Sequence, residues 1–220
     1  MVEALIFDMD GVLLDSEPFW RAALIEELAD LGSTLTEQEA ADTMGIRIDQ
    51  VLEIRQKTHG WSGKTIPEAV DSILDKVIEQ VQTSAVLLPG VEKVLDMAQK
   101  HALKIGLATS SPERLIHAVL HALDLQSSFE VTRSAETLRY GKPHPEIYLI
   151  TAEALGVPPE NCLAIEDSLN GVISAKAARM TCIAVPERIS TDLPGFVLAD
   201  LKLSTLAELK QPDFRRLISA

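Results

Sequence analysis

Short apolar runs alternate with helical segments along most of this chain, and this alternation restricts the fold more than any other feature. Five runs have the length and composition of buried strands: residues 3–8, 104–110, 129–134, 162–167 and 182–186. Segments with apolar residues at helical spacing lie between them, over residues 91–102, 112–123, 144–156 and 168–180. Because strands that alternate with helices are typical of α/β proteins, we predict a Rossmann-like parallel sheet as the core.

One long insertion interrupts the alternation directly after the first predicted strand. Residues 17–87 hold four stretches that favour helices: "PFWRAALIEELADLG", "TEQEAADTMG", "DQVLEIRQKTHG" and "PEAVDSILDKVIEQVQ". None of them has the pattern of a buried strand. We therefore expect a core domain made of residues 1–16 and 88–220, with an inserted α-helical domain over residues 17–87.

The composition of the 220 residues is that of an ordinary globular protein, with 46% hydrophobic and 24% charged residues. The formal net charge of −13 disfavours nucleic acid or an anionic membrane as a partner, because both would be repelled. No signal peptide is visible, and no segment approaches the roughly 20 consecutive apolar residues of a membrane span. We expect a cytoplasmic monomer whose partner is a small molecule.

Polar residues gather where the predicted strands end. They are Asp8 and Asp10 after the first strand, Thr109 and Ser110 after the second, Glu166 and Asp167 after the fourth, and Lys142 in the loop that precedes the fourth. In an open parallel sheet, ligands bind beyond the carboxyl ends of the strands, where the strand order reverses. Taken singly, each of these residues could cap a helix or face water, so the prediction of a site depends on their combination.

Four carboxylates that converge on one place repel each other unless a cation lies between them. A set of ligands that offers only oxygen favours Mg²⁺ over zinc or copper, and Mg²⁺ keeps positions for water and a phosphate group. Lys142 and the Thr109 hydroxyl add further attraction for an anion. One aspartate of the Asp8/Asp10 pair could then attack phosphorus while the other transfers protons. The residues therefore predict Mg²⁺-assisted phosphoryl chemistry.

Four short motifs carry a resemblance to a known family. In this order, "DMDGV" (8–12), "ATSS" (108–111), "GKP" (141–143) and "EDS" (166–168) resemble the signature motifs of the haloacid dehalogenase superfamily of phosphatases. The resemblance covers essentially the whole chain, and the helical insertion is similar to the C1 cap of that superfamily. The stretches "KPHPEIYL", "EDSLNGVISAKAARM" and "FVLADLKLSTLAEL" look most like its bacterial hexitol phosphatase and 2-deoxyglucose-6-phosphate phosphatase group.

The resemblance implies a role for each acidic residue. Asp8 would be the nucleophile, and Asp10 would protonate the leaving sugar oxygen and then activate water. Mg²⁺ would be held by the Asp8 carboxylate, the backbone carbonyl of Asp10 and the Asp167 carboxylate. Glu166 would lie beside the metal, either as an additional ligand or as a group that orients the others.

The resemblance also implies how the phosphoryl group is held. The Thr109 side chain, the Ser110 backbone amide and Lys142 would bind its oxygens and stabilise charge in the transition state. Thr109 stands where many relatives have serine, and the substitution keeps the hydroxyl. Arg47 in the helical insertion is a candidate for substrate contact, with a solvated surface arginine as the alternative.

Together these expectations describe a Mg²⁺-dependent phosphatase of small sugar or sugar-alcohol phosphates that works through an aspartyl phosphate beneath a closing cap. One alternative is a phosphomutase of the β-phosphoglucomutase type, although those mutases carry a histidine where this chain has Trp20. A second alternative is a non-catalytic regulator that binds a phosphorylated ligand. A phosphoglycolate or nucleotide phosphatase would differ only in its substrate.

Overall fold

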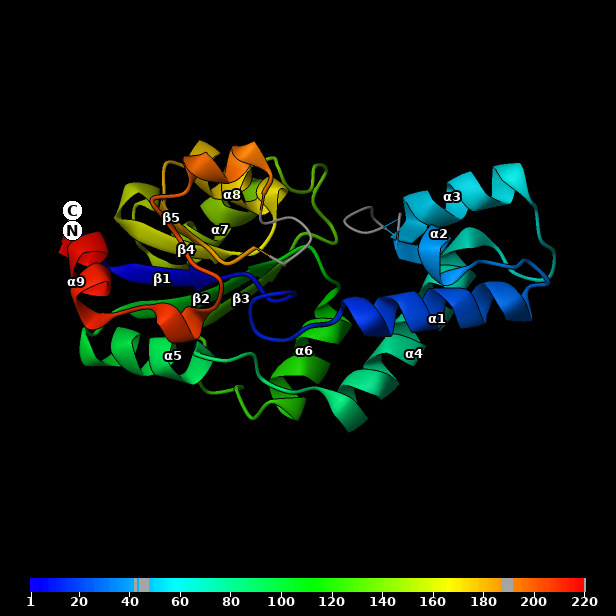
Figure 1. The fold of residues 1–220 in the computed structure, drawn as a ribbon, viewed down its shortest axis with the longest axis horizontal. Coiled ribbons are helices and arrows are strands. Elements are labelled where there is room, and N and C mark those ends of the chain that lie inside the picture. Colours follow the sequence, from blue (N-terminus) through cyan, green and yellow to red (C-terminus); the bar gives the residue numbers. More distant parts are fainter. Residues whose placement is uncertain (42, 44–47, 187–191, 220) are drawn as a thin grey trace. The chain divides into compact units, whose positions relative to one another are not determined.

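The computed structural model describes residues 1–41, 43, 48–186 and 192–219. The chain forms two compact units (Figure 1). One unit consists of Met1–Asp15 with Val86–Ala220 and holds the sheet, and the other consists of Ser16–Ala85 and is helical. An α-helical insertion therefore interrupts an α/β core, as the sequence predicts. No helix within the described ranges is long and apolar enough to cross a membrane.

Six strands of the described chain form one sheet, in the order β3-β2-β1-β4-β5-β6. All neighbouring strands are parallel. The strands are β1 (Ala4–Phe7), β2 (Lys104–Thr109), β3 (Val131–Ser134), β4 (Cys162–Glu166), β5 (Thr181–Ala184) and β6 (Leu201–Lys202). The chain runs outward from β1 to β3 and then returns to the other side of β1. The order therefore reverses between β1 and β4, which is where such sheets bind ligands.

The interiors of the central strands β1 and β4 are apolar because helices cover both faces of the sheet. All residues of β1 and β4 are buried. Phe7 at the end of β1 is level with Leu107 in β2 and with Ile165 in β4. This register places the residues that follow β1 next to the ends of β2 and β4. The sheet thereby brings three separate parts of the sequence to one edge.

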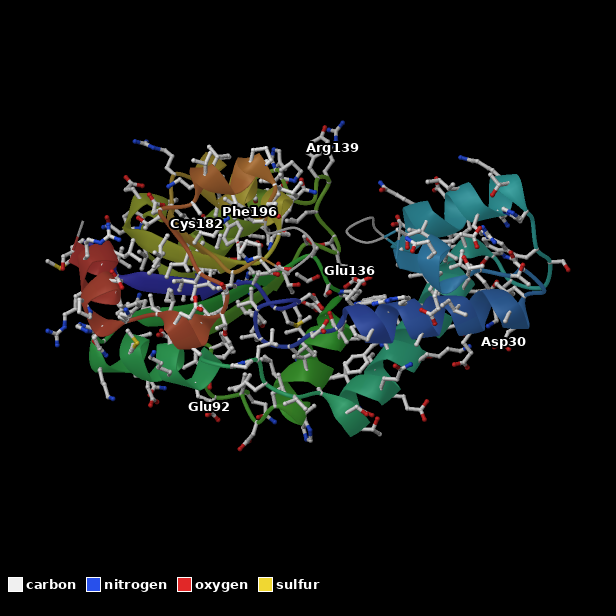
Figure 2. All side chains as sticks on the ribbon, viewed as in Figure 1. Asp30, Glu92, Glu136, Arg139, Cys182 and Phe196 are labelled. Atoms are coloured by element: carbon white, nitrogen blue, oxygen red, sulfur yellow. The ribbon has the colours of Figure 1, made fainter. Side chains whose placement is uncertain are left out.

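Helices of the core unit pack on both faces of the sheet, with α7 and α8 on one face and α5 and α6 on the other (Figure 1). The helices are α5 (Val91–Lys100), α6 (Glu113–Ala122), α7 (Glu146–Leu155), α8 (Leu169–Ala177) and α9 (Gln211–Ser219), with short 3₁₀ turns at Pro159–Asn161, Pro194–Leu198 and Leu206–Glu208. Cys182 and Phe196 belong to the buried cluster that joins the sheet to α7 and α8 (Figure 2).

The helical unit contains α1 (Glu17–Asp30), α2 (Glu37–Ala41), α3 (Ile48–Thr58) and α4 (Ile66–Ser84). Thr65 begins α4 with a capping box in which its hydroxyl accepts from the Glu68 amide and Glu68 accepts from the Thr65 amide. A buried carboxylate on α1, that of Glu27, joins this helix to α4. It accepts hydrogen bonds from Lys64 at 2.7 Å and Ser72 at 2.6 Å. A buried charge in this unit therefore has its partners.

Candidate active site

The first acidic motif lies in a tight turn that begins where β1 ends. The Asp8 amide still donates to the Ile165 carbonyl at 2.9 Å, so the backbone of Asp8 continues the ladder between β1 and β4. Gly11 has a φ of +72°, a conformation that favours glycine. A Cβ at Gly11 would lie 2.2 Å from Oδ2 of Asp167. The turn therefore passes directly against the fourth motif, and only a glycine fits there.

A buried lysine joins the first and fourth motifs. The Nζ atom of Lys142 donates to Oδ1 of Asp8 at 2.6 Å and to Oε1 of Glu166 at 2.6 Å. It also donates to the Ala108 carbonyl in β2 at 3.1 Å. All three donor positions of the ammonium are thus used by acceptors from β2 and from the residues at the ends of β1 and β4.

Glu166 is completely buried, and both of its carboxylate oxygens accept hydrogen bonds from the protein. Oε1 accepts from Lys142 and from the Tyr148 hydroxyl, each at 2.6 Å. Oε2 accepts from the Ser168 hydroxyl at 3.2 Å and from the Ser168 amide at 3.4 Å. A Cβ at Gly171 would lie 1.9 Å from this carboxylate, so Glu166 rests directly on the first turn of α8. The carboxylate is held from several sides.

The charges in this cluster alter the ionisation of its members. Burial raises the pKa of Asp8 from its ordinary value of 3.8 to about 8, with Glu166 and Asp10 adding to the effect and Lys142 opposing it. Burial alone would lower the pKa of Lys142, but the carboxylates of Asp8 and Glu166 outweigh that effect and raise it. Lys142 is therefore a permanent cation here. The ionised form of Asp8, by contrast, would be stabilised by any further positive charge nearby.

Two hydroxyl groups from the end of β2 hold Asp10. Its Oδ2 accepts from the Ser111 hydroxyl at 2.6 Å and from the Thr109 hydroxyl at 3.2 Å. The Thr109 hydroxyl in turn accepts from the Ser111 amide at 3.1 Å, and Ser134 in β3 donates to the Ser111 carbonyl at 2.7 Å. The resemblance implies that Thr109 binds a phosphoryl group, and this role stays a prediction; in the structure its hydroxyl contacts the Asp10 carboxylate.

The acidic cluster has the chemistry of a divalent-cation site. Oxygens of Asp8, Glu166 and Asp167 lie within 4.8 Å of one another. Three carboxylates that offer only oxygen fit a hard cation such as Mg²⁺. Since both Glu166 oxygens already accept hydrogen bonds, Asp8 and Asp167 are the better-placed pair of side-chain ligands.

The structure thus brings most of the predicted site residues together in the core unit. Lys142 contacts both Asp8 and Glu166, and Asp167 lies beside them. Asp10 is hydrogen-bonded to Thr109. Ser110 follows Thr109 and is exposed. Arg47 lies outside the residues that the structure describes.

Sequence reasoning missed three residues that contact the site: Ser111, Tyr148 and Ser168. Ser111 and Ser168 belong to the quoted motifs "ATSS" and "EDS", so the motifs themselves contain a signal for them. Tyr148 follows "KPHPEI" on the buried face of α7, where it has the pattern of an ordinary core residue. Its contact with Glu166 depends on how α7 packs against β4, and that packing is not readable from local spacing.

Comparisons with known proteins identify a family of hydrolases. The model of the haloacid dehalogenase-like hydrolase family matches residues 2–179. The chain is 44% identical over 211 residues to hexitol phosphatase B of Escherichia coli (strain K12), an alignment that covers 96% of this chain and 95% of the relative.

Solved structures show the same fold. CbbY from Rhodobacter sphaeroides in complex with phosphate has a TM-score of 0.86 and 27% identity, over 95% of this chain and 96% of that chain. A β-phosphoglucomutase from Clostridium difficile has a TM-score of 0.83 and 26% identity, over 100% and 98% of the two chains.

Proposed function

Because this chain belongs to the haloacid dehalogenase-like hydrolase family and is a phosphatase, we propose that it hydrolyses the phosphate monoesters of small sugars or sugar alcohols. The likeness to hexitol phosphatase B over nearly the full length supports hexitol phosphates as substrates, with 2-deoxyglucose 6-phosphate as a related candidate. The assignment of residues 17–87 as the cap is part of this proposal.

One observation carries the proposed chemistry: a buried aspartate carboxylate lies 2.6 Å from a buried lysine ammonium, and a second aspartate follows two residues later. A carboxylate in this setting can attack phosphorus, because Lys142 attracts the phosphoryl oxygens to the same place. Asp10 lies in the same turn and is only partly buried, so it can reach a leaving group.

The proposed reaction has two displacements. In the first, an Asp8 oxygen forms a bond to phosphorus as the bond to the sugar oxygen breaks, and protonated Asp10 transfers its proton to that oxygen. In the second, Asp10 removes a proton from water, and the water oxygen displaces the Asp8 carboxylate from phosphorus. The products are the alcohol and inorganic phosphate. The Ser110 amide would hold a phosphoryl oxygen, and Lys142 and the Thr109 hydroxyl would do so once substrate oxygens replace some of the acceptors that these two groups have in the structure.

The metal is the other part of the proposal. The carboxylates of Asp8 and Asp167 and the backbone carbonyl of Asp10 would hold Mg²⁺. Glu166 would orient the cluster rather than bind the metal in the arrangement seen here, because Lys142, Tyr148 and Ser168 donate to its oxygens. Bound Mg²⁺ would offset the charge of the substrate phosphate and of the carboxylates.

Replacement of the nucleophile tests the mechanism. Asp8→Asn removes the attacking charge and keeps the shape, so we expect phosphate release from hexitol phosphates to fall by about 10⁴-fold or more, while the circular dichroism spectrum stays native. Asp96→Asn, which alters an exposed aspartate on α5, should keep wild-type activity. Wild-type turnover in Asp8→Asn would exclude the mechanism.

A phosphomutase is the second candidate, and the likeness to a β-phosphoglucomutase structure favours it. Both reactions would use the same aspartyl phosphate and would differ in the acceptor, which is water in one and a sugar hydroxyl in the other. Product analysis with glucose 1-phosphate separates them. We expect inorganic phosphate and glucose, whereas glucose 6-phosphate without release of phosphate would show a mutase. Because the chain is a phosphatase, a non-catalytic regulator that binds a phosphorylated ligand is no longer an alternative.

A further inference from the structure

Tyr148 on α7 is completely buried and contacts two residues of the site, Glu166 and Lys142. Its hydroxyl donates to Oε1 of Glu166 at 2.6 Å. The Nζ atom of Lys142 lies 5.0 Å from the centroid of the Tyr148 ring, within the range of a cation–π contact. One tyrosine therefore touches the lysine with its ring and the partner of that lysine with its hydroxyl.

The position of the Lys142 ammonium depends on this arrangement. Lys142 and Tyr148 donate to the same oxygen of Glu166, so they share its acceptor capacity. Ser168 holds the other oxygen, and the backbone of Gly171 lies directly against the carboxylate. These contacts prevent the Glu166 carboxylate from moving together with the lysine. The ammonium therefore stays between Glu166 and Asp8.

We propose that Tyr148 is a positioning residue for the phosphoryl-transfer step, which it serves by holding Glu166 and Lys142 in the arrangement that directs the ammonium at Asp8. This inference rests on the proposed function. Burial, together with Glu166 and Asp8, raises the pKa of Tyr148, so the phenol keeps the proton that it donates. Without the hydroxyl, Oε1 of Glu166 accepts from Lys142 alone, and the ammonium is drawn away from Asp8 and from the phosphoryl oxygens.

Tyr148→Phe tests this role because it removes the hydroxyl and keeps the buried ring. We expect kcat for a hexitol phosphate to fall by about tenfold while KM stays within about twofold, since the ammonium acts mainly on the transition state. The matched control is Tyr140→Phe, which removes the hydroxyl of a half-exposed tyrosine and should leave both constants unchanged. Equal constants for Tyr148→Phe and wild type would overturn the proposal.

A double-mutant cycle with Lys142→Ala separates positioning from general stabilisation. If Tyr148 acts through Lys142, adding Tyr148→Phe to the Lys142→Ala variant changes kcat by less than about twofold. Losses that multiply would show that Tyr148 acts independently of Lys142 and would overturn the proposal.

A measurement without turnover keeps this inference distinct from the proposed function. In protein labelled with nitrogen-15 lysine, the Nζ resonance of Lys142 is identified by its loss in Lys142→Ala. We expect this resonance to shift in Tyr148→Phe and to stay in place in Tyr140→Phe, and an unchanged resonance in both would contradict the positioning role. If the wild type releases no phosphate from any ester, the proposed function fails, and this resonance then decides only whether Tyr148 positions the Lys142 ammonium.

Discussion

Asp8 combines burial with the need for a charge, and this combination makes its ionisation sensitive to what surrounds it. Only one cation of the described chain, Lys142, is seen to contact its carboxylate, while the carboxylates of Glu166 and Asp10 act against its charge. A divalent cation would shift the balance toward the ionised nucleophile. At the scale of single residues, a bound metal and a proton would therefore compete for Asp8.

The raised pKa of Asp8 predicts a pH dependence of the stability of the metal-free protein. Burial raises the pKa of Asp8 from 3.8 to about 8, so the folded state keeps a proton that the unfolded state loses near pH 4. The stabilisation from this group is complete below pH 4 and is lost as the pH rises toward 8. Urea unfolding after dialysis against EDTA should show wild type losing stability between pH 5 and 8 relative to Asp8→Asn. Parallel pH curves for the two proteins would contradict this expectation.

Gly11 offers a second test at this scale, because a methyl group there would displace Asp167. The added Cβ would lie 2.2 Å from Oδ2 of Asp167, so we expect Gly11→Ala to raise the Mg²⁺ concentration for half-maximal activity by about tenfold or more. Gly32→Ala is the matched control. Its φ is also positive, at +76°, and apart from Gly32 and its two chain neighbours no heavy atom of the described chain lies within 4 Å of the Cβ position. Equal Mg²⁺ requirements for both variants would show that Asp167 is not displaced.

At the scale of elements, the strands were the most predictable part of the fold. β1 is apolar throughout and β4 is apolar up to Glu166 at its end, because both of their faces are covered, and such runs stand out in the sequence. The motifs that follow them were therefore placed at strand ends correctly. The order of the strands is set by helix crossovers, and the sequence indicates it only through the reversal that a ligand site requires.

Contacts between elements could not be predicted in the same way. Tyr148 lies on a helix whose apolar spacing predicts a core residue, and its hydroxyl meets Glu166 only after α7 packs against the sheet. The bond from Ser111 to Asp10 likewise joins residues from different strand ends. Residue type and spacing identify the members of the cluster, whereas the pairing of donors with acceptors depends on the packed structure.

The helical unit offers a prediction at this same scale, because Glu27 joins α1 to α4. Its buried carboxylate accepts from Lys64 and Ser72 and lies 3.3 Å from Lys76. We expect Glu27→Gln to destabilise this unit by about 2 kcal/mol, since a charged acceptor of buried hydrogen bonds is lost. Hydrogen exchange should report faster opening of α1 and α4.

The control for this prediction is the neighbouring exposed glutamate. Glu26 also lies near Lys76, at 3.0 Å, but its side chain is 61% exposed, so Glu26→Gln should change stability by less than about 0.5 kcal/mol. If the two variants exchange equally fast, Glu27 is not the group that joins the helices.

At the scale of the whole molecule, the charge of −13 and the proposed substrate have the same sign. Long-range attraction therefore does not bring a phosphate ester to this protein, and local cations must hold it. Lys142 provides one such cation, and the acidic cluster provides a place for a second. Bound Mg²⁺ would reconcile the net negative charge of the protein with an anionic substrate.

Metal binding should consequently stabilise the folded molecule as a whole. Mg²⁺ at about one hundred times its dissociation constant contributes about 2.7 kcal/mol if it binds only the folded state, and for a chain of this length that corresponds to about 5–10 °C in Tm. Calorimetry with and without MgCl₂ measures this shift, with NaCl at equal ionic strength as the control for screening. Asp167→Asn should show a smaller shift, because it removes a proposed ligand while Lys142 and Asp8 remain in contact. A wild-type Tm that is the same in both salts would exclude metal binding at this cluster.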